Sequence, residues 1–146
     1  MSQESICYSG GCRCGAVRYR SSSPPILTRV CWCRDCQFFA AGNATVNVCF
    51  AKAEVHIEGL LSDFASVADS GNAMHRRFCP KCGTPLFSEA EARPQYIFVR
   101  AGSLDNPEWA QPAATIWAAS APSWACIDEE LPRHDGQPPP PPSPGR

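Results

Sequence analysis

Seven of the ten cysteines in this chain lie in three tight groups, and their spacing constrains the fold more than any other feature. The groups are Cys12 and Cys14, then Cys31, Cys33 and Cys36, and finally Cys79 and Cys82. Cysteines separated by a single residue cannot easily reach the geometry of an unstrained disulfide with each other. Closely spaced thiolates are typical of metal sites. The sequence therefore favours bound metal over a disulfide framework.

The N-terminal residues and the charge balance indicate where such a protein works and which partners it lacks. Residues 1–19 contain no basic segment followed by an apolar one, and no run of about 18 apolar residues occurs along the chain. The sequence thus predicts a cytoplasmic protein, whose thiols stay reduced and available for metal. The net charge is −1 and basic residues do not cluster, which argues against nucleic acid and membrane surfaces as partners.

Seven cysteines cannot complete two closed zinc sites. A structural zinc takes four protein ligands, whereas a catalytic zinc keeps three and leaves one coordination position open. The simplest division joins the two pairs into a closed site and leaves the trio as an open one. Both pairs are followed directly by a glycine, which tolerates the positive φ that lets backbone N–H groups turn toward the sulfurs. We therefore expect a structural zinc at Cys12, Cys14, Cys79 and Cys82.

The trio could also be structural, and the remaining cysteines need a separate interpretation. In a structural trio, water, a neighbouring chain or another side chain supplies the fourth ligand, and His75 is the strongest candidate within this chain. Cys7, Cys49 and Cys126 stand alone in apolar surroundings. We expect these three to be small buried side chains rather than ligands.

Short segments with β-branched or aromatic residues at alternate positions predict antiparallel β structure through most of the chain. These segments are residues 44–50, 53–59, 61–67, 73–79, 84–89, 96–104 and 114–127. A further strand is expected within residues 24–33, followed by a short turn or helix at 34–40, and Asp105 is expected to cap a helical turn.

The length predicts a single domain, which we place at residues 1–137. Residues 138–146 form a proline-rich tail without apolar side chains of the kind that anchor a segment to a core. The composition predicts that this tail is extended or disordered.

Six sequence blocks together resemble the glutathione-dependent formaldehyde-activating enzyme family, which includes centromere protein V. They are "GGCRCGAVRY" at 10–19, "CWCRDC" at 31–36, "RFCPKCGTPLF" at 77–87, "AGSLDNP" at 101–107, "IWAASAPSW" at 116–124 and "LPRHDGQPP" at 131–139. The resemblance implies a β-tent fold of antiparallel sheets with two zincs per chain. It assigns the structural zinc to the two cysteine pairs and the catalytic zinc to Cys31, Cys33 and Cys36.

The sequence departs from this family at two positions. Many members have histidine where this chain has Trp32, and many read "HIW" where this chain has Thr115, Ile116 and Trp117. Neither position is a metal ligand, but either could shape the pocket and therefore the choice of substrate.

The resemblance implies a carbon–sulfur lyase that joins a thiol such as glutathione to a small aldehyde. Zinc is borderline-soft and deprotonates a bound thiol at neutral pH, so a three-thiolate zinc suits a sulfur substrate. Arg34, Arg76 and Arg77 could meet a carboxylate of the thiol or remain solvated. Aromatic residues could wall the pocket or belong to the core: Trp32, Phe38, Trp117 and Trp124.

The alternative function is a non-catalytic, zinc-stabilised module that binds a protein.

Overall fold

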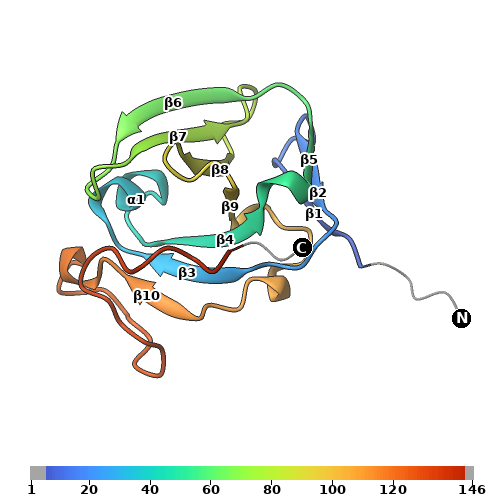
Figure 1. The fold of residues 1–146 in the computed structure, drawn as a ribbon. Coiled ribbons are helices and arrows are strands. Elements are labelled where there is room, and N and C mark those ends of the chain that lie inside the picture. Colours follow the sequence, from blue (N-terminus) through green and yellow to red (C-terminus); the bar gives the residue numbers. More distant parts are fainter. Residues whose placement is uncertain (1–5, 144–146) are drawn as a thin grey trace, which may run out of the picture.

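The computed structural model describes residues 6–143 and shows a mainly β protein built from two sheets (Figure 1). The strands are β1 (Tyr8–Gly11), β2 (Arg18–Ser21), β3 (Leu27–Cys31), β4 (Thr45–Ala51), β5 (Val55–Glu58), β6 (Ser62–Val67), β7 (Ala73–Phe78), β8 (Pro85–Ala90), β9 (Tyr96–Arg100) and β10 (Ala114–Ile116). This confirms the predicted fold class, and every predicted strand segment contains a strand.

The larger sheet has seven strands in the order β10-β3-β4-β9-β8-β7-β6, and the smaller one has the order β1-β2-β5. The large sheet curves from β3 through β9 to β6, so that its two ends lie on opposite sides of helix α1 (Arg34–Phe39) in Figure 1. The pairings between these strands are antiparallel except that of β10 with β3, which is parallel. Alternation of side chains along a strand does not reveal the direction of its partner, so the sequence could not predict this exception.

The core lies between the small sheet and one face of the large sheet. Alternate residues of a strand point to opposite faces, so Val48 and Phe50 of β4 pack in the core together with Ile97 and Val99 of β9. Tyr19 of the small sheet closes this core and stacks edge-on against an aromatic ring of β8. The opposite face of β4 and β9 is also largely buried, because it forms the wall of a pocket.

The connections between strands agree with the sequence predictions except for one helix cap. Helix α1 forms where a short turn or helix is expected. The helical turn at Pro107–Trp109 also forms, but Asn106 caps it with a hydrogen bond from the Glu108 N–H to its side-chain oxygen. Asp105, the predicted cap, binds Arg18 and Ser9 instead. Adjacent Asp and Asn have similar capping preferences, and the arginine partner from the small sheet decided between them.

The C-terminal segment, which follows β10 in the sequence, runs back across strands of the large sheet. The N–H groups of Thr115 and Trp117 donate to the carbonyl oxygens of Pro132 and Gly136 at 2.9 and 3.3 Å. Farther along, the hydroxyl of Tyr96 lies 2.9 Å from the Pro141 carbonyl oxygen. Up to Ser143, the tail therefore makes specific contacts that its composition did not indicate. A domain boundary at residue 137 stays a prediction, and residues 144–146 lie outside the described part of the chain.

The isolated cysteines divide into one buried and two exposed residues. Cys49 is fully buried on β4, as expected. Cys7 and Cys126 are exposed, and the expectation that they are buried was wrong. Cys7 directly precedes the edge strand of the small sheet and Cys126 lies in a loop, so apolar neighbours in sequence did not bring either of them into the core.

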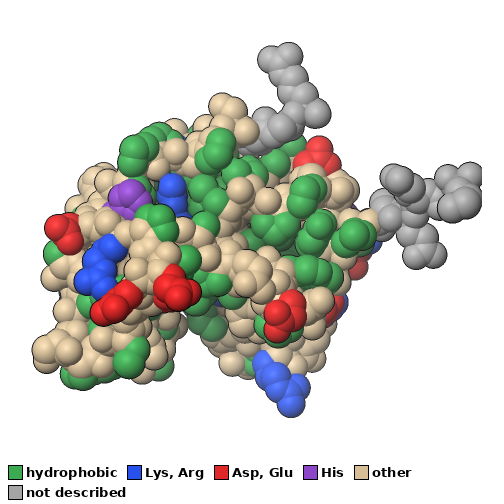
Figure 2. Space-filling model, turned by 90° about the horizontal axis from the view of Figure 1, so that it is seen from below, with side chains coloured by type: hydrophobic (Ala, Val, Ile, Leu, Met, Phe, Trp, Pro, Cys, Tyr) green, Lys and Arg blue, Asp and Glu red, His purple; other side chains and the backbone are tan. Residues whose placement is uncertain are grey.

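The surface agrees with a balanced charge. Figure 2 shows scattered lysine and arginine side chains on the face that it draws, without a continuous basic patch. Within residues 6–143, no helix combines the length and apolar composition that crossing a bilayer requires.

At Gly10, the backbone of β1 packs directly against the segment after β9, and a substitution there tests this packing. A Cβ atom at this position would lie 2.3 Å from the Ser103 carbonyl oxygen and 2.4 Å from the Tyr19 hydroxyl. We expect Gly10→Ala to lower the free energy of unfolding by about 2 kcal/mol or more, because the backbone must shift. Gly102→Ala is the control, since its Cβ meets nothing within 4 Å. Equal denaturation midpoints of the two variants would contradict this packing.

Candidate metal centres

The four paired cysteines meet at one point between the two sheets. Cys12 and Cys14 lie in the turn between β1 and β2, whereas Cys79 and Cys82 lie in the turn between β7 and β8. Their Sγ atoms all lie within 4.8 Å of one another. The separations from Cys14 are 3.6 Å to Cys12 and 3.7 Å to Cys79. A tetrahedron with zinc–sulfur bonds of about 2.3 Å has edges of about 3.8 Å, so these thiols fit zinc.

Each half of this cluster is a tight turn that ends at a glycine. Gly15 and Gly83 have φ angles of 83° and 77°, the left-handed conformation expected from the sequence. Their N–H groups donate to the carbonyl oxygens of Cys12 and Cys79 at 3.1 and 2.9 Å, which closes each turn. The N–H of Lys81 then points at the Cys79 sulfur from 3.4 Å. These turns direct N–H groups toward the thiolates and so lower the cost of gathering negative charge.

The surroundings of the four thiols favour ionisation unequally. Hydrogen bonds from Thr84 lower the pKa of Cys82 to about 5. For Cys14, a hydrogen bond from the backbone of Ala16 lowers the pKa, but desolvation and the neighbouring thiols raise it to about 11. Without a positive ion, a second thiolate beside the first is unfavourable. A divalent ion removes this repulsion and keeps all four sulfurs deprotonated.

The cysteine trio forms a second cluster at the N-terminus of α1. Cys31 is the last residue of β3, Cys33 caps the helix, and Cys36 lies in its first turn. All three are buried and their Sγ atoms lie within 4.8 Å of one another. Among the described residues, no histidine, carboxylate or further cysteine joins this group.

His75, the candidate for a hidden fourth ligand, is engaged elsewhere. Its Nδ1 lies 2.7 Å from a carboxylate oxygen of Asp63, and its Nε2 lies 2.8 Å from one of Glu91. Both ring nitrogens thus have acidic partners, one on the edge strand β6 and one directly after β8. His75 contributes to the packing of β6, β7 and β8 rather than to the trio.

The trio favours one thiolate in the absence of a metal. Hydrogen bonds from Cys31 and Cys33 lower the pKa of Cys36 to about 2, and the charge of Arg100 adds to this effect. Hydrogen bonds with Cys33 and Cys36, together with burial, raise the pKa of Cys31. The interaction with Cys31 lowers the pKa of Cys33, but its hydrogen bond to Cys36 and burial raise it to about 11. A divalent ion at this point would allow all three thiols to ionise.

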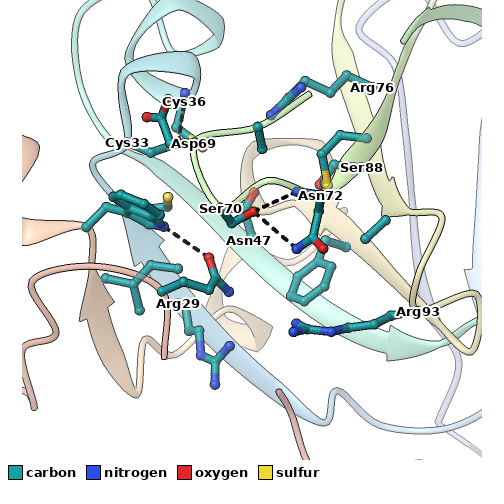
Figure 3. Close-up of a pocket in the computed structure, with 18 of the residues that line it drawn as sticks. Arg29, Cys33, Cys36, Asn47, Asp69, Ser70, Asn72, Arg76, Ser88 and Arg93 are labelled. Carbon is teal, nitrogen blue, oxygen red and sulfur yellow. Dashed lines mark hydrogen bonds between the residues drawn. The ribbon is translucent and has the colours of Figure 1, made fainter. Parts of the chain in front are cut away.

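The trio forms one end of a pocket of about 110 Å³ on the face of the large sheet opposite the core (Figure 3). Strand alternation explains the floor of this pocket, because residues two apart share a face. Arg29 and Cys31 of β3 line it, as do Phe98 and Arg100 of β9. The loop between β6 and β7 covers the floor and contributes Ser70, among other residues.

The arginines suggested by the sequence have different roles. Arg76 is buried in the pocket wall, where it donates to the Ser66 hydroxyl at 2.7 Å and lies 3.5 Å from Asp35. Arg34 donates to Gln37 at 2.7 Å and stacks on the exposed ring of Phe38. Arg77 is paired with a carboxylate of β8. Only Arg76 of the three lines the pocket.

The aromatic candidates are also divided. Trp117 lines the pocket, and its Nε1 donates to the Gln137 side chain at 3.0 Å. Trp32 is buried and packs edge-on against Trp124, outside the pocket wall. Thr115 is buried too and does not line the pocket. The two departures from the family pattern therefore change the packing behind the site rather than its surface.

Three arginines of the pocket were missed by the sequence reasoning: Arg29, Arg93 and Arg100. Arg100 is only 9% exposed and donates to the side-chain oxygen of Asn47 on the neighbouring strand. Burial lowers the pKa of Arg100, and the Cys36 thiolate opposes this change. A buried cation beside three thiolates offsets part of their charge. The sequence offered one weak signal for Arg29: it precedes Cys31 by two positions in a predicted strand, and residues two apart share a face.

Comparisons with known proteins agree with this architecture. The family model described as glutathione-dependent formaldehyde-activating enzyme matches residues 7–120. The fold is similar to that of a Rhodobacter sphaeroides protein determined by crystallography as a structural genomics target. The TM-score is 0.55 at 19% identity, over 68% of this chain and 92% of that one. A search of curated proteins finds no significant match. The chain belongs to the glutathione-dependent formaldehyde-activating enzyme family.

The two cysteine clusters predict different responses to mutation. Cys79→Ser should lose one zinc equivalent and most of the thermal stability, because a structural zinc contributes on the order of 10 kcal/mol and joins the two sheets. Cys36→Ser should lose one equivalent and keep most of the fold. Zinc content and thermal unfolding measure both effects. Cys126→Ser, at an exposed lone cysteine, is the control. Equal loss of stability in Cys79→Ser and Cys36→Ser would refute the division into structural and open sites.

The environment of His75 predicts a pH-dependent contribution to stability. Hydrogen bonds that the protonated ring donates to the carboxylates of Asp63 and Glu91 raise the pKa of His75 above its ordinary value. A raised pKa in the folded state stabilises the protein below about pH 6.5, and this contribution disappears as the pH rises through the raised value. We expect His75→Gln to lower the unfolding midpoint more at pH 6 than at pH 9. His56→Gln is the control, since His56 lies on the exposed edge of the small sheet. A deficit that stays constant with pH would contradict the charged pairing.

Proposed function

We propose that this chain is a zinc-dependent carbon–sulfur lyase that adds a thiol, such as glutathione, to a small aldehyde, or releases it. The observation that carries the proposal is the trio of Cys31, Cys33 and Cys36, which faces a pocket and lacks a fourth ligand among the described residues. Membership of the formaldehyde-activating family supports the choice of thiol and aldehyde. Reduced thiols suit the cytoplasmic location that the sequence predicts.

Three cysteines can hold zinc and leave one coordination position toward the pocket. When bound there, zinc supplies a positive charge that deprotonates a thiol at neutral pH. The reaction then forms one sulfur–carbon bond, and the electron pair of the carbonyl moves to its oxygen. The proton lost by the thiol reappears on that oxygen, so that neither an oxidant nor a reductant is needed.

The residues around the trio contribute by position and charge. Three thiolates and one divalent ion leave a net charge of −1, which weakens the attraction for an incoming anion. The buried guanidinium of Arg100 offsets this charge, and Asn47 holds its orientation. Arg76 lies in the same wall, anchored by Ser66 and Asp35. The pocket thus holds the thiol and aldehyde together away from bulk water, and such positioning accelerates a bimolecular reaction.

The alternative is a zinc-stabilised module that binds a protein without catalysis. One feature favours it: β6 is an edge strand of the large sheet, and its Phe64 and Val67 are exposed. An edge strand with apolar side chains can pair with an extended segment of another protein. The experiment below separates this alternative from the enzyme.

The test follows loss of free thiol after glutathione and formaldehyde are mixed with the protein. We expect a rate above that of the protein-free reaction, two zincs per chain, and a fall to the protein-free rate in Cys33→Ser. Cys126→Ser should keep the activity of the original protein. Two zincs without any acceleration would contradict the lyase and favour the binding module.

A further inference from the structure

Two of the four arginines in the pocket wall have no acidic partner. Arg76 pairs with Asp35, and Arg100 faces the thiolate of Cys36. Within residues 6–143, neither Arg29 nor Arg93 takes part in an ion pair. Arg29 donates once to a backbone carbonyl, that of Pro139, at 3.3 Å. Most of the donors of these two guanidinium groups therefore remain available.

Arg29 and Arg93 come from separate elements and reach the same end of the pocket. Arg29 lies on β3, and Arg93 lies in the turn between β8 and β9. Figure 3 shows both side chains at the end away from Cys33 and Cys36, with the polar side chains of Ser70 and Asn72 between the two ends. The pocket thus has a sulfur-rich end and a guanidinium-rich end.

The two guanidinium groups are close enough to affect each other. Burial lowers the pKa of Arg29, the Cys49 thiol opposes this effect, and the positive charge of Arg93 adds to the lowering. Both arginines are half-buried. Like charges that share a half-buried site destabilise it unless an anion compensates them. Asp69 is the only carboxylate in the pocket wall within residues 6–143, and there it forms no ion pair with either of them.

We propose that Arg29 and Arg93 form a carboxylate-binding subsite at the end of the pocket opposite the three cysteines. The proposal rests on the proposed function, because it identifies what the substrate of that site must carry. Planar guanidinium groups bind carboxylates through paired hydrogen bonds, which fixes orientation as well as affinity. A substrate held at this end would present its reacting group to the cysteines.

The carboxylate can belong to either reactant, and matched substrates distinguish the two sources. Glutathione and its diethyl ester present the same thiol with and without free carboxylates. Glyoxylate and formaldehyde present an aldehyde with and without one. KM is measured for each of the four, with the second reactant held at saturation, in Arg29→Gln, Arg93→Gln and the control Arg20→Gln. Arg20 is exposed on β2 and lies outside this pocket.

We expect both pocket variants to raise KM by about 10-fold or more for the carboxylated member of one pair, since a charge-assisted hydrogen bond is lost. KM for the partner without a free carboxylate, and zinc content, should stay unchanged. A rise confined to glutathione places the carboxylate on the thiol, and one confined to glyoxylate places it on the aldehyde. Arg29→Lys and Arg93→Lys should recover part of the affinity, because they keep the charge. An equal change for the partners with and without a carboxylate would overturn the subsite and leave the proposed reaction intact.

Binding without turnover separates this inference from the proposed reaction. S-methylglutathione and glyoxylate are titrated into the zinc-loaded protein and followed by calorimetry. Loss of affinity for either probe in both Arg29→Gln and Arg93→Gln supports the subsite even if no thiol is consumed. If neither probe loses affinity in either variant, the subsite is wrong, whatever the outcome of the thiol assay.

Discussion

The structure depends on the contact between two turns that lie almost seventy residues apart. Cys12 and Cys14 lie in the turn between β1 and β2 of the small sheet, and Cys79 and Cys82 lie in the turn between β7 and β8 of the large sheet. The four sulfurs lie within 4.8 Å of one another. Four thiolates repel one another, so this contact is favourable only around a positive ion. The free energy of binding such an ion is comparable with the whole free energy of unfolding of a domain. An ion bound by these four cysteines would hold the small sheet over the core face of the large sheet.

The large sheet serves both stability and function because its two faces differ. On β4, Val48 and Phe50 enter the core, whereas Asn47 turns to the pocket and positions Arg100. On β3, Arg29 and Cys31 share the pocket face. A one-residue shift in strand register would exchange these faces, so the packing of the core also fixes the position of the charged groups. The positions of Arg29, Cys31 and the buried Arg100 thus follow from the register of these strands.

The C-terminal segment completes this arrangement. It lies beyond the residues that match the family model, yet Gln137 lines the pocket and holds the indole of Trp117. Trp117 itself has a left-handed backbone with a φ of 55°, an unusual conformation for a residue with a large side chain. Its N–H donates to Gly136, which helps to hold this conformation in place. The segment therefore contributes to the wall of the site as well as to the edge of the sheet.

By itself, the sequence determined the features that depend on local spacing. The cysteine intervals and the following glycines predicted a closed group of four and an open group of three, and alternation predicted the strands. Tertiary structure alone decided the rest: that Asp105 binds Arg18 while Asn106 caps the turn, that Cys7 and Cys126 are exposed, and that β10 runs parallel to β3. It also decided which arginines face the pocket. An arginine toward solvent and one toward a site have the same local pattern, and only the neighbours brought by the folded sheet distinguish them.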